Sequence, residues 1–175
     1  MSTKALKEIY DQYADMVYNL ALSYVQNAED AEEITQDVFV KVHLKLNEFE
    51  GKSSLKTWVY RITINQSLDF IKLRKSQKRS GTTLRIVNDE DEEFRMPGHF
   101  NHPGVELEHK EATEQIFEAI NQLPDNQKTA LILKSIEHLS QKEIAQTLQV
   151  SEKSVESLLL RARKSLKNLI NFEGK

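Results

Sequence analysis

The chain contains no cysteine, and among its 175 residues there are only five glycines and three prolines. Without cysteine it cannot hold a disulfide framework, a thiolate zinc site or a cysteine nucleophile. The shortage of glycine and proline disfavours a turn-rich β architecture and favours helices. No apolar run approaches membrane-spanning length, and the N-terminus lacks the hydrophobic stretch of a signal peptide. These absences predict an all-α protein of the reducing cytoplasm.

Charge is plentiful but nearly balanced. Charged residues make up 29% of the chain and the net charge is −3, which argues against a protein that binds duplex DNA tightly by itself. The acidic excess lies in the middle, because residues 81–111 hold eight acidic and three basic residues. The flanking parts are close to neutral, with local patches of either sign.

Apolar residues at helical spacing predict three helices within residues 1–80. The first, over residues 4–26, is expected to bury Leu6, Ile9, Tyr10, Tyr13, Met16, Val17, Leu20 and Tyr24. The second, capped by Asn27, is expected to bury Ala31, Ile34, Val38, Val42 and Leu46 with Phe39 alongside, and the third, over 55–78, Trp58, Ile62, Leu68 and Ile71. Three such helices are enough to enclose one small domain.

Helical periodicity is lost after Gly81 and resumes near Val105. The intervening stretch carries a run of five acidic residues over 89–93 and two of the three prolines, so we expect residues 81–111 to be a flexible linker. A second helical domain is predicted over 112–175. It begins with an apolar stripe of Leu107, Ile116, Ile120 and Leu123, followed by a helix capped by Asp125 with Ala130, Leu131 and Leu133 inside.

Residues 141–160 have the pattern of a helix-turn-helix. Ser140 and Glu143 form a capping-box signature at the start of the first helix. Its inward residues are Ile144, Ala145 and Leu148, the turn is Gln149 with Val150, and Ser151 caps the second helix. Val155, Leu159, Ala162, Leu166 and Leu169 form the buried stripe of that second helix. Gln149 stands where glycine is usual.

The opposite face of this second helix carries polar and basic residues, which are Lys153, Ser154, Ser157, Arg161 and Lys164. Such a helix suits the major groove, and cations beside it suit phosphates. The alternative is a pair of ordinary antiparallel helices with a polar outer face. The basic cluster of Arg161, Arg163, Lys164 and Lys167 favours DNA binding.

Two further segments carry concentrated charge. Residues 28–37 hold five acidic residues and no basic one, which indicates either a docking surface for a basic protein or simply a solvated face. Residues 72–79 hold five basic residues and follow Phe49, Trp58, Tyr60 and Asn65, side chains that can stack on and hydrogen-bond to unpaired bases. The alternative is that Trp58 belongs to the core and the charges are solvated.

Taken in order, these segments resemble the extracytoplasmic-function (ECF) sigma factors of bacterial RNA polymerase. The resemblance spans almost the whole chain, with residues 10–79 similar to sigma region 2 and 112–170 similar to region 4. It is carried by residues 30–39 (DAEEITQDVF), by 49–62 (FEGKSSLKTWVYRI) with Asn65 and Asp69, by Leu123 with Pro124, and by 139–145 (LSQKEIA). It implies two helical domains, no catalysis and no cofactor or metal.

The resemblance also implies roles for individual residues. Those expected to dock on the polymerase clamp helices are Asp30, Glu33, Gln36 and Asp37. At the minus-ten element, Phe49 and Asn65 are expected to hold a flipped base. The residues expected beside them are Lys52, Lys56, Trp58 and Arg61, and those expected to hold the DNA backbone are Lys72, Arg74 and Lys75. Those expected at the minus-thirty-five element are Ser151, Lys153, Ser154, Glu156, Ser157, Arg161 and Lys164.

Glu156 and Leu158 depart from the family, which often has arginine or lysine there, so a weaker phosphate grip is expected. The implied partners are core RNA polymerase through its clamp helices and flap, promoter DNA, and an anti-sigma factor that would hold the chain at the inner membrane face. No small-molecule substrate is expected.

Three rival functions remain open. A stand-alone helix-turn-helix regulator would bind specific DNA without polymerase. A metal-dependent enzyme would use His99, His102 and His109 with Glu106, since histidines three apart can ligate zinc. An interaction adaptor would use the acidic helix alone and would leave the helix-turn-helix without a role.

Overall fold

The computed structural model describes residues 3–80 and 110–173, which are helical and contain no strand. They fall into two compact units, each with its own packing. The first contains residues up to Asn47 and those from Ile62 to the end of the third helix, and the second contains Glu48–Arg61 and the helices from Lys110 onward. The predicted all-α architecture is confirmed. Most of the predicted linker lies outside the described residues.

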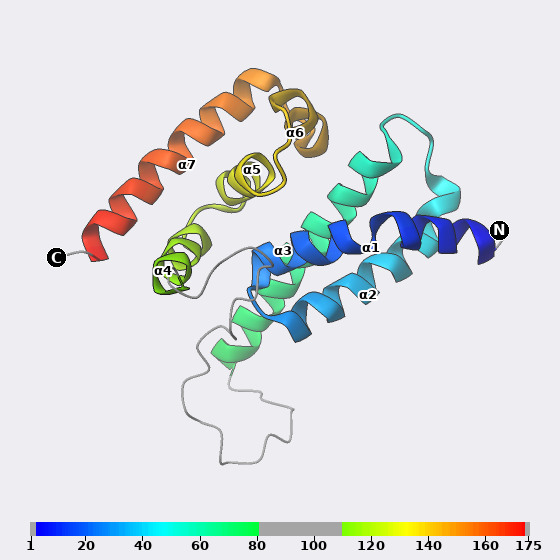
Figure 1. Cartoon of the computed structure of the whole chain (residues 1–175), viewed down its shortest axis with the longest axis horizontal. Coiled ribbons are helices and arrows are strands. Elements are labelled where there is room, and N and C mark those ends of the chain that lie inside the picture. The colour runs from blue at the N-terminus through cyan, green and yellow to red at the C-terminus, as the bar shows by residue number, and fades with distance from the viewer. Residues whose placement is uncertain (1–2, 81–109, 174–175) are drawn as a thin grey trace, which may run out of the picture. The chain divides into compact units, whose positions relative to one another are not determined.

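In the first unit, α1 (Thr3–Val25) and α2 (Ala28–Lys45) pack along each other, side by side in Figure 1. Asn27 caps α2 as predicted, its Oδ1 accepting from the Asp30 backbone amide at 2.9 Å. The predicted stripe of α2 is buried from Ala31 to Val42, while Leu46 is half-buried in a 3₁₀ turn (Leu46–Glu48). Tyr10 was expected inside but is 49% exposed, and its ring leans on Phe39 with centroids 4.7 Å apart.

The third helix, α3 (Leu55–Ser80), begins where the sequence predicts, and the Ser54 hydroxyl accepts from the Thr57 amide at its start. The face that it buries was predicted wrongly. Trp58, Ile62, Leu68 and Ile71 are only half-buried, whereas the buried positions include Thr63, Gln66 and Ser67. Ser67 bonds within its own helix, its Oγ donating to the Thr63 carbonyl at 2.8 Å, whereas Gln66 bonds to side chains of α2, so hydropathy reveals neither of these buried residues.

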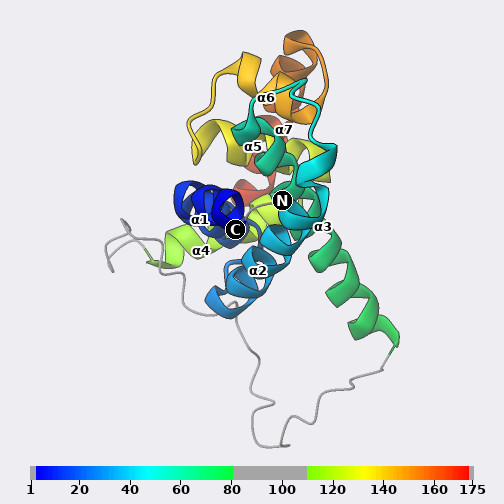
Figure 2. The same ribbon diagram turned by 90° about the vertical axis from the view of Figure 1, so that its right-hand side faces the viewer.

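The second unit contains α4 (Lys110–Asn121), α5 (Asp125–Ser135), α6 (Gln141–Leu148) and α7 (Glu152–Glu173). Helix α7 contacts each of the other three, and Figures 1 and 2 both show α6 beside its start. Ala130, Leu131, Leu133, Ile144, Val155, Leu159 and Ala162 are buried as predicted.

Four details of this unit differ from prediction. Leu148, Leu166 and Leu169 were expected to be buried but are half-buried. Ile116 is 42% exposed, so it does not belong to the core stripe. Pro124 occupies the N-cap position of α5 without a side-chain hydrogen bond, and Asp125 lies inside the first turn, where its charge suits the helix dipole. Helix α4 already begins at Lys110, within the range assigned to the linker.

Candidate polymerase and DNA interfaces

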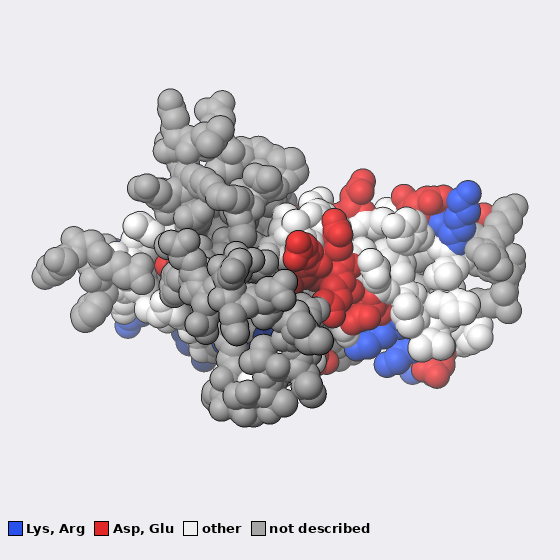
Figure 3. Space-filling view, turned by 90° about the horizontal axis from the view of Figure 1, so that it is seen from below, with Lys and Arg blue, Asp and Glu red and all other residues white. Residues whose placement is uncertain are grey.

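The first candidate surface is the acidic side of α2. Among the residues expected to dock on polymerase, Glu33, Gln36 and Asp37 are exposed. Glu29 and Glu32 are exposed nearby, and Figure 3 shows a group of acidic side chains gathered on one face of the molecule. A surface of this charge attracts basic partners over about one Debye length.

Asp30 differs from the other predicted docking residues. It is buried, with 7% of its surface exposed, and its carboxylate forms an ion pair with Arg74 of α3. The guanidinium of Arg74 also lies over the Phe70 ring, 5.4 Å from the centroid. In this structure neither charged group is directed at an external partner, because each is engaged with the other.

Asp37 is exposed yet it also has an internal partner. Gln66 Nε2 of α3 donates to Asp37 Oδ2 at 2.7 Å, and the Gln66 amide oxygen accepts from Lys41. Gln66 is 9% exposed, and these two bonds connect the acidic side of α2 to α3. Sequence reasoning missed Gln66 and Lys41, since a single glutamine in a helix carries no periodic signal.

The second candidate surface is the outward side of α3. Trp58, Arg61, Asn65, Asp69 and Lys72 recur at three- and four-residue steps, and so share one face of the helix. Asn65, Asp69 and Lys72 are exposed, whereas Trp58 and Arg61 are half-buried. By the same spacing, Lys56 and Arg74 lie on the opposite side of α3. The predicted minus-ten residues therefore divide between two faces, and Lys75 lies exposed near the outward one.

At the N-terminal side of α3, Phe49 and Trp58 are brought together. Their ring centroids are 5.2 Å apart with an interplanar angle of 46°, and both side chains are half-buried. Gly51 in the loop between them has φ of 70°, the left-handed region that glycine favours. Lys52 is exposed and pairs with Glu50.

Lys56 and Arg61 make contacts within the second unit. Lys56 Nζ lies 5.8 Å from the centroid of the Tyr60 ring, and Arg61 donates to the Gln146 carbonyl at 2.8 Å. The Tyr60 hydroxyl donates to Glu137 Oε2 at 2.8 Å, and burial together with the Glu137 charge raises the Tyr60 pKa above its usual range. Tyr60 therefore stays a donor.

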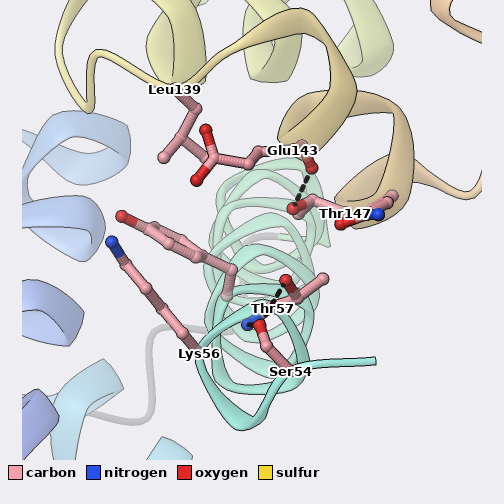
Figure 4. Close-up of a pocket in the computed structure, with 8 residues that line it drawn as sticks. Ser54, Lys56, Thr57, Leu139, Glu143 and Thr147 are labelled. Carbon is pink, nitrogen blue, oxygen red and sulfur yellow. Dashed lines mark hydrogen bonds between the residues drawn. The ribbon is translucent and has the colours of Figure 1, made fainter. Parts of the chain in front are cut away.

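A small pocket opens beside these contacts. Figure 4 shows Ser54, Lys56 and Thr57 on one wall and Leu139, Glu143 and Thr147 on the other. The Thr147 hydroxyl donates to the Glu143 carbonyl at 2.8 Å, so this wall is tied to its own helix.

The third candidate surface is the helix-turn-helix of α6 and α7. Both hydrogen bonds of the Ser140–Glu143 capping box are present. The Ser140 hydroxyl and the Ser140 backbone amide both donate to the Glu143 carboxylate and lower its pKa. Gln149 ends α6 with φ of 56° and ψ of 43°, the left-handed conformation of a helix C-cap. The chain thus makes the turn without the glycine that the conformation favours.

The outer face of α7 is exposed at all seven residues expected to contact the minus-thirty-five element. The Ser151 hydroxyl accepts from the Ser154 amide at 3.1 Å, and the two hydroxyls lie 2.8 Å apart. Ser151 therefore acts as the helix cap. Arg161 folds back on Ser157, with its Nε 3.2 Å from the carbonyl and its Nη2 3.1 Å from the hydroxyl. Of the two departures from the family, Glu156 is exposed and Leu158 is half-buried.

The metal hypothesis rested on His99, His102, Glu106 and His109, which lie outside the described residues. Residues 3–80 and 110–173 contain no group of three side chains able to hold a metal ion. In the same ranges, no helix is long and apolar enough to cross a membrane.

Two family models match the chain. Residues 9–78 match sigma-70 region 2, and residues 113–166 match sigma-70 region 4. The chain is 33% identical to the RNA polymerase sigma factor SigV of Bacillus subtilis, over 95% of this chain and 92% of that protein. It is 28% identical to the ECF RNA polymerase sigma-E factor of Haemophilus influenzae, over 95% of this chain and 88% of that protein.

Solved structures share the fold. The sigma factor RpoE of Bartonella quintana, in complex with the anti-sigma factor NepR, aligns with a TM-score of 0.63 and 22% identity over 97% of this chain and 98% of that one. CnrH in complex with the cytosolic domain of CnrY aligns with a TM-score of 0.65 and 20% identity, over 97% and 90%. These findings favour the initiation-factor interpretation over a stand-alone regulator. The chain belongs to the ECF sigma factors of the sigma-70 family, transcription initiation factors that bind core RNA polymerase and direct it to promoters.

Proposed function

We propose that residues 1–80 dock on polymerase and open the minus-ten element, and that residues 112–175 read the minus-thirty-five element. The observation that carries this division is the distribution of charge: exposed carboxylates predominate on α2, whereas the outward faces of α3 and α7 expose mainly amide, hydroxyl and cationic groups beside the single acids Asp69 and Glu156. Polymerase would supply most phosphate contacts, which accounts for a DNA-directed chain with a net charge of −3.

The docking surface that we propose is Glu33, Gln36 and Asp37. Asp30 would act indirectly, because its pairing with Arg74 holds α2 against α3. The clamp helices are the expected partner of this surface, and the polymerase flap is the expected partner of the second domain.

For opening, we propose that the exposed Asn65 hydrogen-bonds to an extruded base and that the Phe49 and Trp58 rings provide stacking. Stacking contributes about 1–3 kcal/mol per base and offsets the few kcal/mol needed to unstack it. Lys52, Arg61, Lys72 and Lys75 would hold nearby backbone. The chain itself would break and form no covalent bond.

We further propose cytoplasmic location and control by an anti-sigma factor. Core polymerase and promoter DNA are both cytoplasmic in bacteria, and the two structural relatives were solved with an anti-sigma factor or a cytosolic partner domain. A partner that covers α2 would block polymerase docking.

The test is transcription in vitro with core RNA polymerase, using the Glu33→Lys and Gln36→Lys double variant. Both residues are exposed, so the variant should fold while its docking charge is reversed. We expect loss of core binding and at least tenfold less promoter-specific transcript, since reversing close charges costs more than 1.4 kcal/mol. The control changes two exposed acids of α1, Glu8→Lys and Asp11→Lys, and should retain activity. A docking variant that transcribes as well as the parent would show the assignment to be wrong.

A further inference from the structure

Leu160 is the apolar exception on the outer face of α7. It is 70% exposed, the highest fraction among the large exposed hydrophobic side chains of the described residues. The burial of Val155, Leu159 and Ala162 defines the inner face of α7, and Leu160 lies opposite to it. It follows Ser157 by three residues and Lys153 by seven, and precedes Lys164 by four, so it lies at the centre of the proposed DNA-facing surface.

The side chains around Leu160 do not cover it. The Arg161 side chain is drawn back onto Ser157 by two hydrogen bonds, and so does not extend past Leu160. The side chains one turn away are Glu156, Ser157, Arg163 and Lys164, all polar and exposed. None of them provides an apolar patch with which Leu160 would form a separate protein-docking site.

The length of α7 is compatible with Leu160 lying in the groove. Leu160 comes eight positions after the helix start at Glu152, about 12 Å along the axis at 1.5 Å per residue. The major groove is also about 12 Å wide, so a helix that lies in it from its N-terminus would still hold Leu160 beside the base edges. Lys164 and Lys167, further along, would then reach phosphates.

Only one base presents an apolar group in that groove. Guanine, adenine and cytosine offer hydrogen-bonding atoms, which leucine cannot engage, whereas thymine presents its C5-methyl group. We propose that Leu160 reads a thymine methyl in the minus-thirty-five element and is a specificity-determining residue of this sigma factor. The inference rests on the proposed role of α7.

The first measurement identifies the thymine. The holoenzyme, made from core polymerase with the parent chain or with Leu160→Ala, selects promoters from a library with a randomised minus-thirty-five region. The parent should prefer thymine at one position on either strand, and the variant should lose that preference while keeping the others. Alanine is a good helix former and the site is exposed, so the variant keeps α7 intact.

The second measurement removes only the methyl. Deoxyuridine replaces the selected thymine, which keeps every hydrogen-bonding group of the base. Promoter binding by the parent holoenzyme should weaken about fourfold, equivalent to about 0.8 kcal/mol for one buried methyl, and binding by Leu160→Ala should not change. The matched control is Ile170→Ala, another exposed apolar residue of α7, which should retain the full effect of uracil.

Two outcomes would overturn the inference alone. One is an equal uracil effect in parent and Leu160→Ala. The other is a uniform loss of binding by Leu160→Ala on every sequence, which would indicate a protein contact. If the parent holoenzyme showed no preference at minus thirty-five at all, the role of α7 would fail and this inference with it.

Discussion

Helices α3 and α7 both carry residues proposed to contact DNA, but they are held in different ways. The buried face of α7 is apolar, with Val155, Leu159 and Ala162, whereas α3 buries Thr63, Gln66 and Ser67 in addition to Val59 and Ile64. Polar contacts between helices, from Gln66 to Asp37 and from Arg74 to Asp30, join α3 to α2. These polar contacts have correct hydrogen-bonding geometry in only one arrangement of the two helices. The position of α3 therefore depends on particular partner side chains, whereas that of α7 depends on apolar packing.

The largest loss of stability is expected when a polar contact between α3 and α2 is removed. Arg74→Ala would remove the ion pair of the buried Asp30 carboxylate. Because the Arg74 side chain is 50% exposed, the expected cost is about 2 kcal/mol, less than for a fully buried pair. Hydrogen exchange measured by mass spectrometry should show faster exchange in α2 and α3 and unchanged exchange in α6 and α7. Asp69→Ala, on the outward face of α3, is the control and should leave exchange as it is. Equal protection in Arg74→Ala and Asp69→Ala would contradict the comparison.

A smaller effect is expected at the capping box of the helix-turn-helix. Ser140→Ala removes the acceptor of the Glu143 amide and should destabilise α6 by about 1 kcal/mol near neutral pH, as measured by denaturation with urea. Hydrogen bonds from the Ser140 hydroxyl and backbone amide lower the Glu143 pKa below the ordinary value of 4.5 for a glutamate. The carboxylate therefore contributes its full stability above that pH, and the contribution is lost as the pH falls through the lowered pKa. The difference between parent and variant should shrink on acidification, and a difference that grows instead would refute the role of Glu143.

The smallest effect is expected at the turn. Gln149 adopts φ of 56°, which costs a non-glycine residue energy that glycine avoids. Gln149→Gly should therefore stabilise the second unit by about 0.5 kcal/mol, seen as a small rise in the denaturation midpoint. Gln146→Gly, in the middle of α6, is the control and should destabilise by about 1 kcal/mol. A loss of stability in Gln149→Gly would mean that the Gln149 side chain matters more than its backbone strain.

The helix-turn-helix could be predicted from the sequence, whereas the buried face of α3 could not. The helix-turn-helix was predictable because its signals are local: a serine three residues before a glutamate, and apolar residues at helical spacing. The interior of α3 was not, because Trp58 and Ile71 are more hydrophobic than Thr63 and Ser67 and yet less buried. Hydropathy ranks side chains by transfer from water and takes no account of hydroxyls that bond to their own helix.

The sequence by itself determined that the chain is helical, that it contains a helix-turn-helix, and that it resembles a sigma factor. These follow from composition, from periodicity and from motifs within single segments. The tertiary structure decided which charges remain available, because pairing depends on residues distant in the sequence: Arg74 meets Asp30 across 44 positions and Gln66 meets Asp37 across 29. Periodicity already placed Leu159 in the buried stripe of α7. The tertiary structure added how far the neighbouring leucines are exposed, since Leu160 is 70% exposed and Leu158 is half-buried, and this depends on what packs beside α7.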